Sequence, residues 1–98
     1  MAYEVHANLA WGFVIPEEPR ITVSGGGVTI ETAGPDDYPQ YVVAVYESLM
    51  STDSSSCLQL PPLSVDRRWL GLVEKFCNAN GIPVQDPGWV LYYFFTWR

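Results

Sequence analysis

Few residues of this chain are of types that could carry out chemistry. They are one histidine, two cysteines and two adjacent acid pairs: His6, Cys57, Cys77, Glu17–Glu18 and Asp36–Asp37. His6 falls on the polar side of an alternating strand pattern, which is the usual place of a surface histidine. Neighbouring residues on a chain diverge, so neither acid pair forms a dyad that shares a proton.

The thiols and the glycines also favour structural roles. Cys77 lies on the apolar side of a predicted helix, so we expect it to pack in the core, although nearby Arg67, Arg68 or Lys75 could lower its pKa. Two cysteines and one histidine are too few for a structural zinc site. The glycines of 25–27 precede no Lys-Ser/Thr pair, so they indicate a turn and not a phosphate loop. We predict no enzyme activity, no metal and no cofactor.

The net charge of −6 comes from eleven acids and five bases that are unevenly distributed. No Lys or Arg occurs between Ile21 and Asp66. Phosphate binding needs clustered Lys and Arg, so we expect no direct binding to nucleic acid. The charge either serves solubility or steers the chain toward a protein with a basic surface. In the second case the candidate partner-binding acids are Glu31, Asp36, Asp37, Glu47 and Asp53.

The N-terminal half predicts strands. Residues 3–15 alternate between apolar and polar side chains, which indicates a long half-buried strand, and Gly12 could mark a bulge or a bend. Residues 21–23 and 28–30 flank a glycine-rich turn, which predicts a hairpin. The N-terminus shows no basic region followed by an apolar run, so we expect no secretory signal and a cytoplasmic protein.

Residues 38–50 are ambiguous. Asp36 and Asp37 are suitable N-caps, and an apolar stripe with helical spacing follows them, yet 41–46 is rich in strand-forming residues. We predict a helix here. A flexible polar loop is expected around 51–63, followed by a second helix that Ser64 caps and that ends at Asn80–Gly81.

The segment from Gly88 to Arg98 is apolar on both sides when it is drawn as a strand. It is far too short for a membrane helix, which needs about 20 residues. We therefore expect residues 1–98 to form one α+β domain, with a mostly antiparallel sheet of about four strands in the order ββ–β–α–α–β. Two helices pack on one face of this sheet, and the terminal strand pairs centrally, beside the first strand.

Two helices cover only one face of such a sheet, and the aromatic strand then keeps an uncovered side. Either Tyr92 and Phe94, or else Trp89, Tyr93 and Trp97, would face solvent unless the first strand curls over them. Tyr and Trp are enriched at interfaces. The candidate partner-binding residues on this strand are Tyr92, Phe94 and Trp97.

These observations predict a small acidic protein-binding module that acts by occupying the surface of a partner. Small acidic inhibitors from phages, anti-CRISPR proteins among them, and toxin-immunity proteins share this general profile, although no motif ties the chain to one family. The alternative is a homo-oligomeric assembly component, such as a homodimer formed through the aromatic strand. A small enzyme would need His6 near a carboxylate or a thiol.

Overall fold

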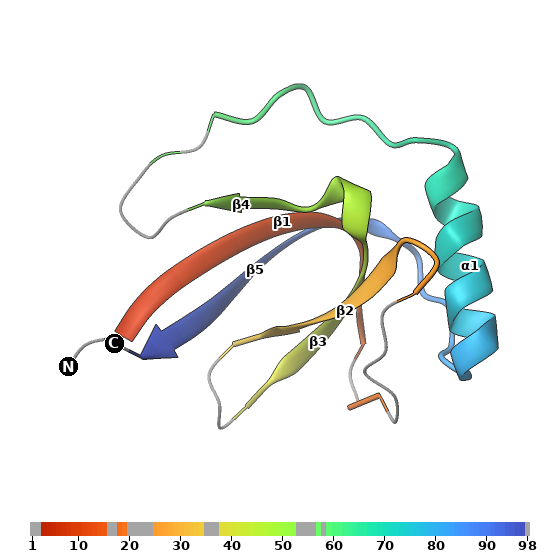
Figure 1. Ribbon diagram of the computed structural model, residues 1–98, viewed down its shortest axis with the longest axis horizontal. Helices are drawn as coiled ribbons and strands as arrows, with labels where there is room; N and C mark the ends of the chain where they lie inside the picture. Colours follow the sequence, from red (N-terminus) through yellow and green to blue (C-terminus); the bar gives the residue numbers. More distant parts are fainter. Residues whose placement is uncertain are drawn as a thin grey trace.

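The first strand is the centre of the sheet in the computed structural model, which describes residues 3–15, 18–19, 25–34, 38–52, 57 and 59–97 (backbone alone at 3, 4, 52, 96 and 97). The elements are β1 (Tyr3–Ile15), β2 (Val28–Ala33), β3 (Gln40–Val45), the 3₁₀ turn η1 (Tyr46–Ser48), β4 (Met50–Thr52), α1 (Arg68–Asn80) and β5 (Gly88–Trp97). Together they form a small α+β domain with a five-stranded antiparallel sheet (Figure 1).

Three of the other four strands pair with β1. One edge of β1 pairs with β5 from Tyr3 to Gly12. The opposite edge pairs with β4 at Ala7–Leu9 and with β3 at Gly12–Ile15. The fourth, β2, pairs with the outer edge of β3, so the strands form four rows: β2, then β3 with β4, then β1, then β5.

The row that contains β3 and β4 is one strand interrupted by η1. Gly12 pairs with Ala44 and Leu9 pairs with Met50, so the two residues between them on β1 face five residues of this row, 45–49. The surplus is the three-residue turn η1. At the interruption the buried Ser48 hydroxyl accepts a hydrogen bond from the Trp11 amide (2.8 Å) and donates one to the Val45 carbonyl (2.6 Å). One side chain therefore replaces the missing ladder bonds.

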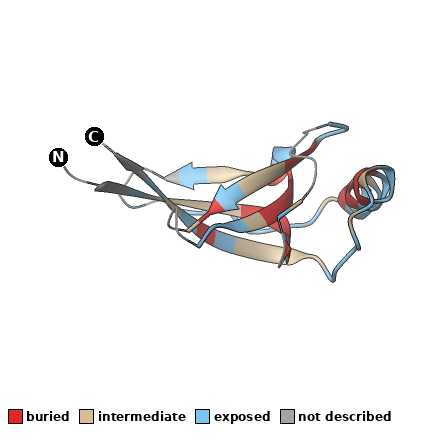
Figure 2. Ribbon diagram, turned by 90° about the horizontal axis from the view of Figure 1, so that it is seen from below, coloured by how far each residue is buried: buried red, intermediate tan, exposed pale blue. Residues whose placement is uncertain are grey.

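The helix α1 packs against one face of the sheet, at the end where β1 meets β3. Figure 2 shows buried residues on the side of α1 that faces the sheet. The cluster consists of Trp11, Phe13, Ile15, Val28, Val43 and Val45 from strands, and Trp69, Val73, Phe76 and Cys77 from α1. The predicted helix stop is confirmed: Gly81 has φ 67°, and the Ile82 amide donates to the Cys77 carbonyl at 2.9 Å.

The opposite face is covered because the sheet curls until its outer rows meet. Just after β2, the Gly34 amide donates to the Tyr93 carbonyl of β5 at 2.6 Å. The curl encloses a second cluster of mostly small side chains: Ala10, Ala33, Val42, Ala44 and Tyr92. Gly12 permits this close approach, since a Cβ there would lie 1.8 Å from the Val43 carbonyl oxygen.

The prediction of a helix over 38–50 is wrong. Residues 40–45 form β3, and 50–52 form β4. The strand-forming run from Tyr41 to Val45 gains ladder partners on both edges and is mostly buried, which outweighs the local helix signals. The expected caps, Asp36 and Asp37, lie outside the described residues. Among the described residues there is thus one helix, and the expectation of two is not met.

Other expectations differ in detail. β5 does lie beside β1, but it forms an outer row, because β1 takes the central place. The helix begins at Arg68 and not after Ser64, since the Asp66 carboxylate accepts the Arg68 amide at 2.9 Å. The hairpin arm 21–23 lies outside the described residues, and residues 28–30 pair with β3. In the predicted 51–63 loop, 51–52 belong to β4, 53–56 and 58 are not described, and 57 and 59–63 are exposed.

We expect Ser48→Ala to lower the free energy of unfolding by about 1–3 kcal/mol, because it leaves the buried Trp11 amide without an acceptor. Urea denaturation measures this change. The matched control is Ser51→Ala, an exposed serine on β4, which should change stability by less than about 0.5 kcal/mol. Equal effects of the two substitutions would show that the Ser48 bridge is dispensable.

We expect Gly12→Ala to destabilise the fold by about 3 kcal/mol or to prevent folding, because β3 must move to admit the methyl group. The control is Gly71→Ala on the exposed side of α1, where the added Cβ meets nothing within 4 Å. That change should stabilise the protein by roughly 0.5–1 kcal/mol. Thermal and urea denaturation compare the two, and a neutral Gly12→Ala would contradict the close approach of β1 and β3.

Candidate interaction surface

An apolar strip extends along β1 and β5 beyond the reach of α1. In the register of these strands Leu9 faces Leu91, Ala7 faces Tyr93, and Val5 faces Phe95. We call these six residues the β1–β5 strip. Its members Val5, Leu91, Tyr93 and Phe95 are between 39% and 57% exposed. All six are uncharged, so the strip is a continuous apolar surface that faces the same side of the sheet as α1.

The strip is exposed because a single helix covers only part of this face. Trp89 is half-buried at the boundary, where it packs edge-on against Trp69 with 6.0 Å between ring centroids. The ring centroid of Trp69 in turn lies 5.9 Å from that of Trp11. These three tryptophans end the covered region, and the next residues of β5 on this face carry the strip. The predicted second helix would have been the natural cover for it.

The residues predicted on β5 lie mainly on the other face. Tyr92 is only 5% exposed, and Phe94 is half-buried and stacks on His6 with centroids 4.9 Å apart. The side chain of Trp97 is outside the described residues. The sequence indicated that one side of β5 would be uncovered. The residues named there combine both sides: Tyr92 and Phe94 belong to the side that the curl encloses, and Trp97 alternates with them along the strand. The alternation of residues defines the two faces of β5, but nothing local in the sequence shows which of them is covered.

Glu31 lies beside the second cluster, because it pairs with Val42 of that cluster. It is half-buried on β2, and burial raises the pKa of its carboxyl. Burial also raises the pKa of Tyr92. A hydrogen bond from Asn8 Nδ2 to the Tyr92 hydroxyl (3.3 Å) lowers this pKa, and the charge of Glu31 raises it by a smaller amount. Asn8 Oδ1 is buried with no hydrogen-bond partner among the described residues. This polar group therefore belongs to the interior of the curl.

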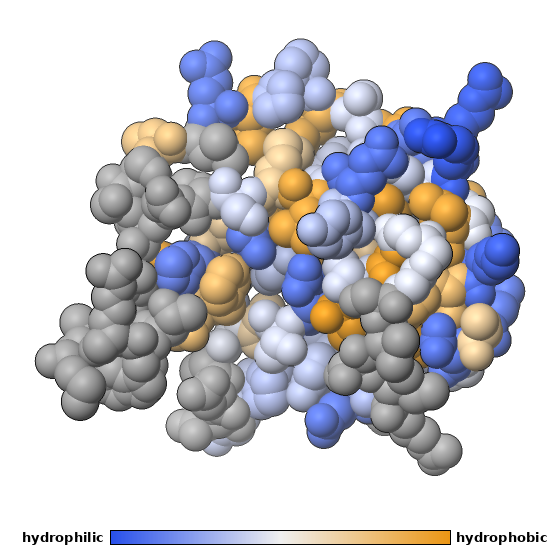
Figure 3. Space-filling view, viewed as in Figure 1, coloured by the Kyte–Doolittle hydropathy of each residue, from blue (hydrophilic) through white to orange (hydrophobic). Residues whose placement is uncertain are grey.

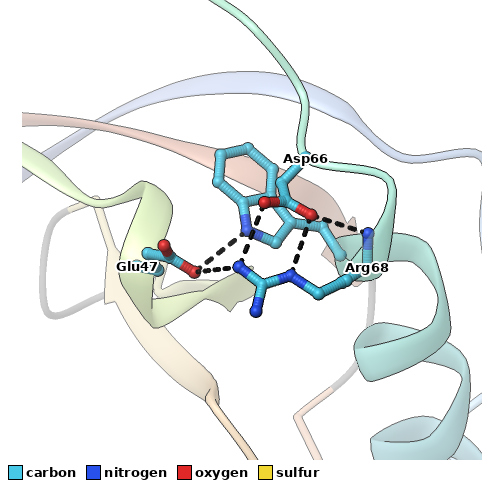
Figure 4. A network of polar contacts seen from close by, with 4 residues as sticks. Glu47, Asp66 and Arg68 are labelled. Atoms are coloured by element: carbon cyan, nitrogen blue, oxygen red, sulfur yellow. Dashed lines mark hydrogen bonds and ion pairs between the residues drawn. The ribbon is translucent and has the colours of Figure 1, made fainter.

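Glu47 lies elsewhere, in a network that joins η1 to the start of α1 (Figure 4). The Asp66 carboxylate accepts hydrogen bonds from Arg68 Nε and Nη2 at 3.1 Å each. Glu47 Oε2 lies 3.9 Å from Arg68 Nη2 and accepts a hydrogen bond from Trp69 Nε1 at 3.4 Å. The hydrogen bonds from Arg68 lower the pKa of Asp66, and Asp66 raises that of Arg68. Exposed pairs of this kind contribute little stability.

The two predicted acids that the structure describes, Glu31 and Glu47, do not lie with the strip. Glu31 lies in the curl, Glu47 lies beside α1, and Asp36, Asp37 and Asp53 are outside the described residues. The strip itself was missed as a set, since it combines two strands that are far apart in the chain. The signal that could have found it is the double apolar character of the last strand.

Groups with reactive potential are dispersed. Burial raises the pKa of the Cys77 thiol, which disfavours the reactive thiolate, and Cys57 is exposed. Within the described ranges no three His, Cys, Asp or Glu side chains come together as a metal site. In the part of the chain that the structure describes, no helix is long and apolar enough to cross a membrane.

Comparison with protein-family models, with curated proteins and with solved structures finds no match to this chain. The physical character of its surfaces is therefore the basis for a functional proposal.

We expect Glu31→Gln to raise the free energy of unfolding at neutral pH. The pKa of Glu31 in the folded state is raised above its ordinary value of 4.5. At a pH above the folded-state pKa the carboxylate is charged, and its burial lowers the free energy of unfolding. This destabilisation disappears as the pH falls below 4.5, because the carboxyl is then protonated in both states. Thermal unfolding between pH 4 and pH 8 measures the difference. Glu74→Gln on the exposed side of α1 is the control. A Glu31→Gln effect independent of pH would contradict this assignment.

Proposed function

We propose that this protein is a binding module that docks its β1–β5 strip on the surface of another protein. The exposed apolar strip is the observation that carries the proposal. Covering the exposed parts of its four large side chains would remove on the order of 300 Å² from water, worth about 8 kcal/mol. Patches of about this size are often functional on monomeric proteins. Association costs several kcal/mol of lost freedom, so contacts around the strip must add to the affinity.

The partner that fits best is a protein with a basic surface around an apolar patch. The chain carries a net charge of −6, and the described bases Arg67, Arg68 and Lys75 lie on or next to α1, whereas the strip is on β1 and β5. A negative net charge would speed the encounter with a basic partner. We propose that the module acts by occupancy, as a cytoplasmic inhibitor of the kind found among phage anti-defence and immunity proteins.

Self-association is the second candidate function. It is favoured because the strip is uncharged and spans two adjacent strands. Two copies can pack strip on strip around a two-fold axis, because an apolar surface is complementary to itself. The net charge of −6 on each copy opposes this arrangement and makes it weaker at low ionic strength. The two candidates therefore respond to salt in opposite directions.

Leu91→Glu and Tyr93→Glu each place a charge in the strip and should reduce partner binding at least tenfold. The control is Tyr38→Glu, which alters a tyrosine that is even more exposed and lies outside the strip. The tagged full-length variants are compared by quantitative mass spectrometry of proteins captured from the source cells, and the affinity of the purified partner is then measured. A partner that binds all three variants equally, or no partner that distinguishes them, would refute the proposal.

The same experiment tests the role of charge in partner binding. Raising the salt concentration, and the double substitution Asp36→Lys/Asp37→Lys, should both weaken capture of a basic partner. Binding that is indifferent to both removes charge steering and leaves the apolar strip as the determinant. Light scattering of the wild-type protein tests the second candidate: a strict monomer at micromolar concentration excludes it, and a dimer that Tyr93→Glu dissociates supports it.

A further inference from the structure

A second surface lies away from the strip, in the segment that leads into α1. We call residues 59–66 the strap. It has neither helix nor strand, and every residue from Gln59 to Val65 is exposed. In Figure 1 it runs over the top of the molecule toward α1, and apolar surface appears along the same rim in the space-filling view (Figure 3). Its large aliphatic residues, Leu60, Leu63 and Val65, are between 42% and 48% exposed.

The sequence of the strap sets its conformation. Proline holds φ near −65°, and a residue that precedes proline is restricted to extended conformations. In Leu60-Pro61-Pro62-Leu63 these restrictions apply to three consecutive residues, and together they favour the polyproline II helix. That helix has three residues per turn, so Leu60 and Leu63 lie along the same edge.

The backbone of the strap is left for a partner to contact. Within the described part of the chain, no backbone hydrogen bond joins residues 59–65 to another backbone group, and the first such bond runs from the Trp69 amide to the Asp66 carbonyl at 3.0 Å. A polyproline II segment has no internal hydrogen bonds, so its carbonyls can accept bonds from another molecule. The contacts of Asp66 with Arg68 hold the end of the strap at the start of α1.

We propose that the strap is a docking segment for a protein domain that reads polyproline II helices in an aromatic-lined groove. The aromatic rings of such a domain receive the proline and aliphatic side chains of its ligand. Because the extended segment has little conformational entropy to lose, binding is favoured. Residues 61–64 of the strap border a shallow groove with Met50, Trp69 and Trp89, and all four remain exposed. The proposal does not involve the strip, so each can fail without the other.

The charge of the chain specifies the rim of the partner groove. Arg67 and Arg68 follow the strap directly and offset the charges of Asp66 and Glu47, so the net charge of −6 on the chain decides which rim is favoured. A groove with an acidic rim would be repelled by this negative net charge. The matching domain has a basic rim, and its binding weakens as salt is added.

The test titrates the isotope-labelled full-length protein with purified SH3, WW and EVH1 domains that include members with basic rims. At least one should bind with Kd of about 100 µM or tighter and shift the amide resonances of Leu63, Ser64 and Val65. Pro61→Ala/Pro62→Ala and Leu63→Ala should each weaken that binding at least tenfold. The matched control is Leu70→Ala, a leucine on α1 with the same 45% exposure, which should change Kd less than twofold.

Three results would overturn the proposal. They are the absence of binding below 1 mM across the domains, an affinity that survives the double proline substitution, and equal losses for Leu63→Ala and Leu70→Ala. Circular dichroism of each variant shows that the fold is retained, which is expected because residues 59–65 make no backbone bond to the rest of the described chain.

Discussion

The close contact between β1 and β3 at Gly12 is the constraint on which the rest of the fold depends. Gly12 pairs with Ala44 on one edge and with Gly88 on the other, so three strands meet at a residue without a side chain. The carbonyl of Val43 occupies the position that a Cβ would take. This contact lets the sheet bend sharply enough for the end of β2 to reach β5, and a few small residues then fill the enclosed space. The curl therefore covers this face without any helix.

The two faces of the sheet consequently differ in how they are completed. The curl closes one face with alanines and Tyr92, without any contribution from α1. On the other face α1 packs on the end of the sheet at which β1 meets β3, and the packing ends at Trp11, Trp69 and Trp89. Beyond these tryptophans the same strands continue with apolar side chains and no cover. The exposed surface is therefore a direct result of how a short helix is placed on a long two-stranded ribbon.

Local patterns predicted the elements whose character is uniform along their length. The alternation of β1, the apolar stripe of α1 with its glycine stop, and the extended last strand all follow from residue order. The segment from Tyr41 to Val45 was misjudged because its helix and strand signals conflict, and ladder partners on both sides decide between them. The face of β5 that stays open could not be predicted either. It depends on Gly34 reaching Tyr93 across a separation of 59 residues, which no local pattern encodes.

The pairing of β1 with β5 also has a kinetic consequence. Its register joins residues that are between 76 and 94 positions apart, from Gly12 with Gly88 to Tyr3 with Trp97. Closing so long a loop costs entropy before any contact repays it, and chains dominated by such pairings fold slowly. On the ribosome, β1 is synthesised first and cannot complete its central place until β5 has emerged. During that interval the ten residues of β1 that pair with β5 have an unpaired edge, which exposes the nascent chain to edge-to-edge association.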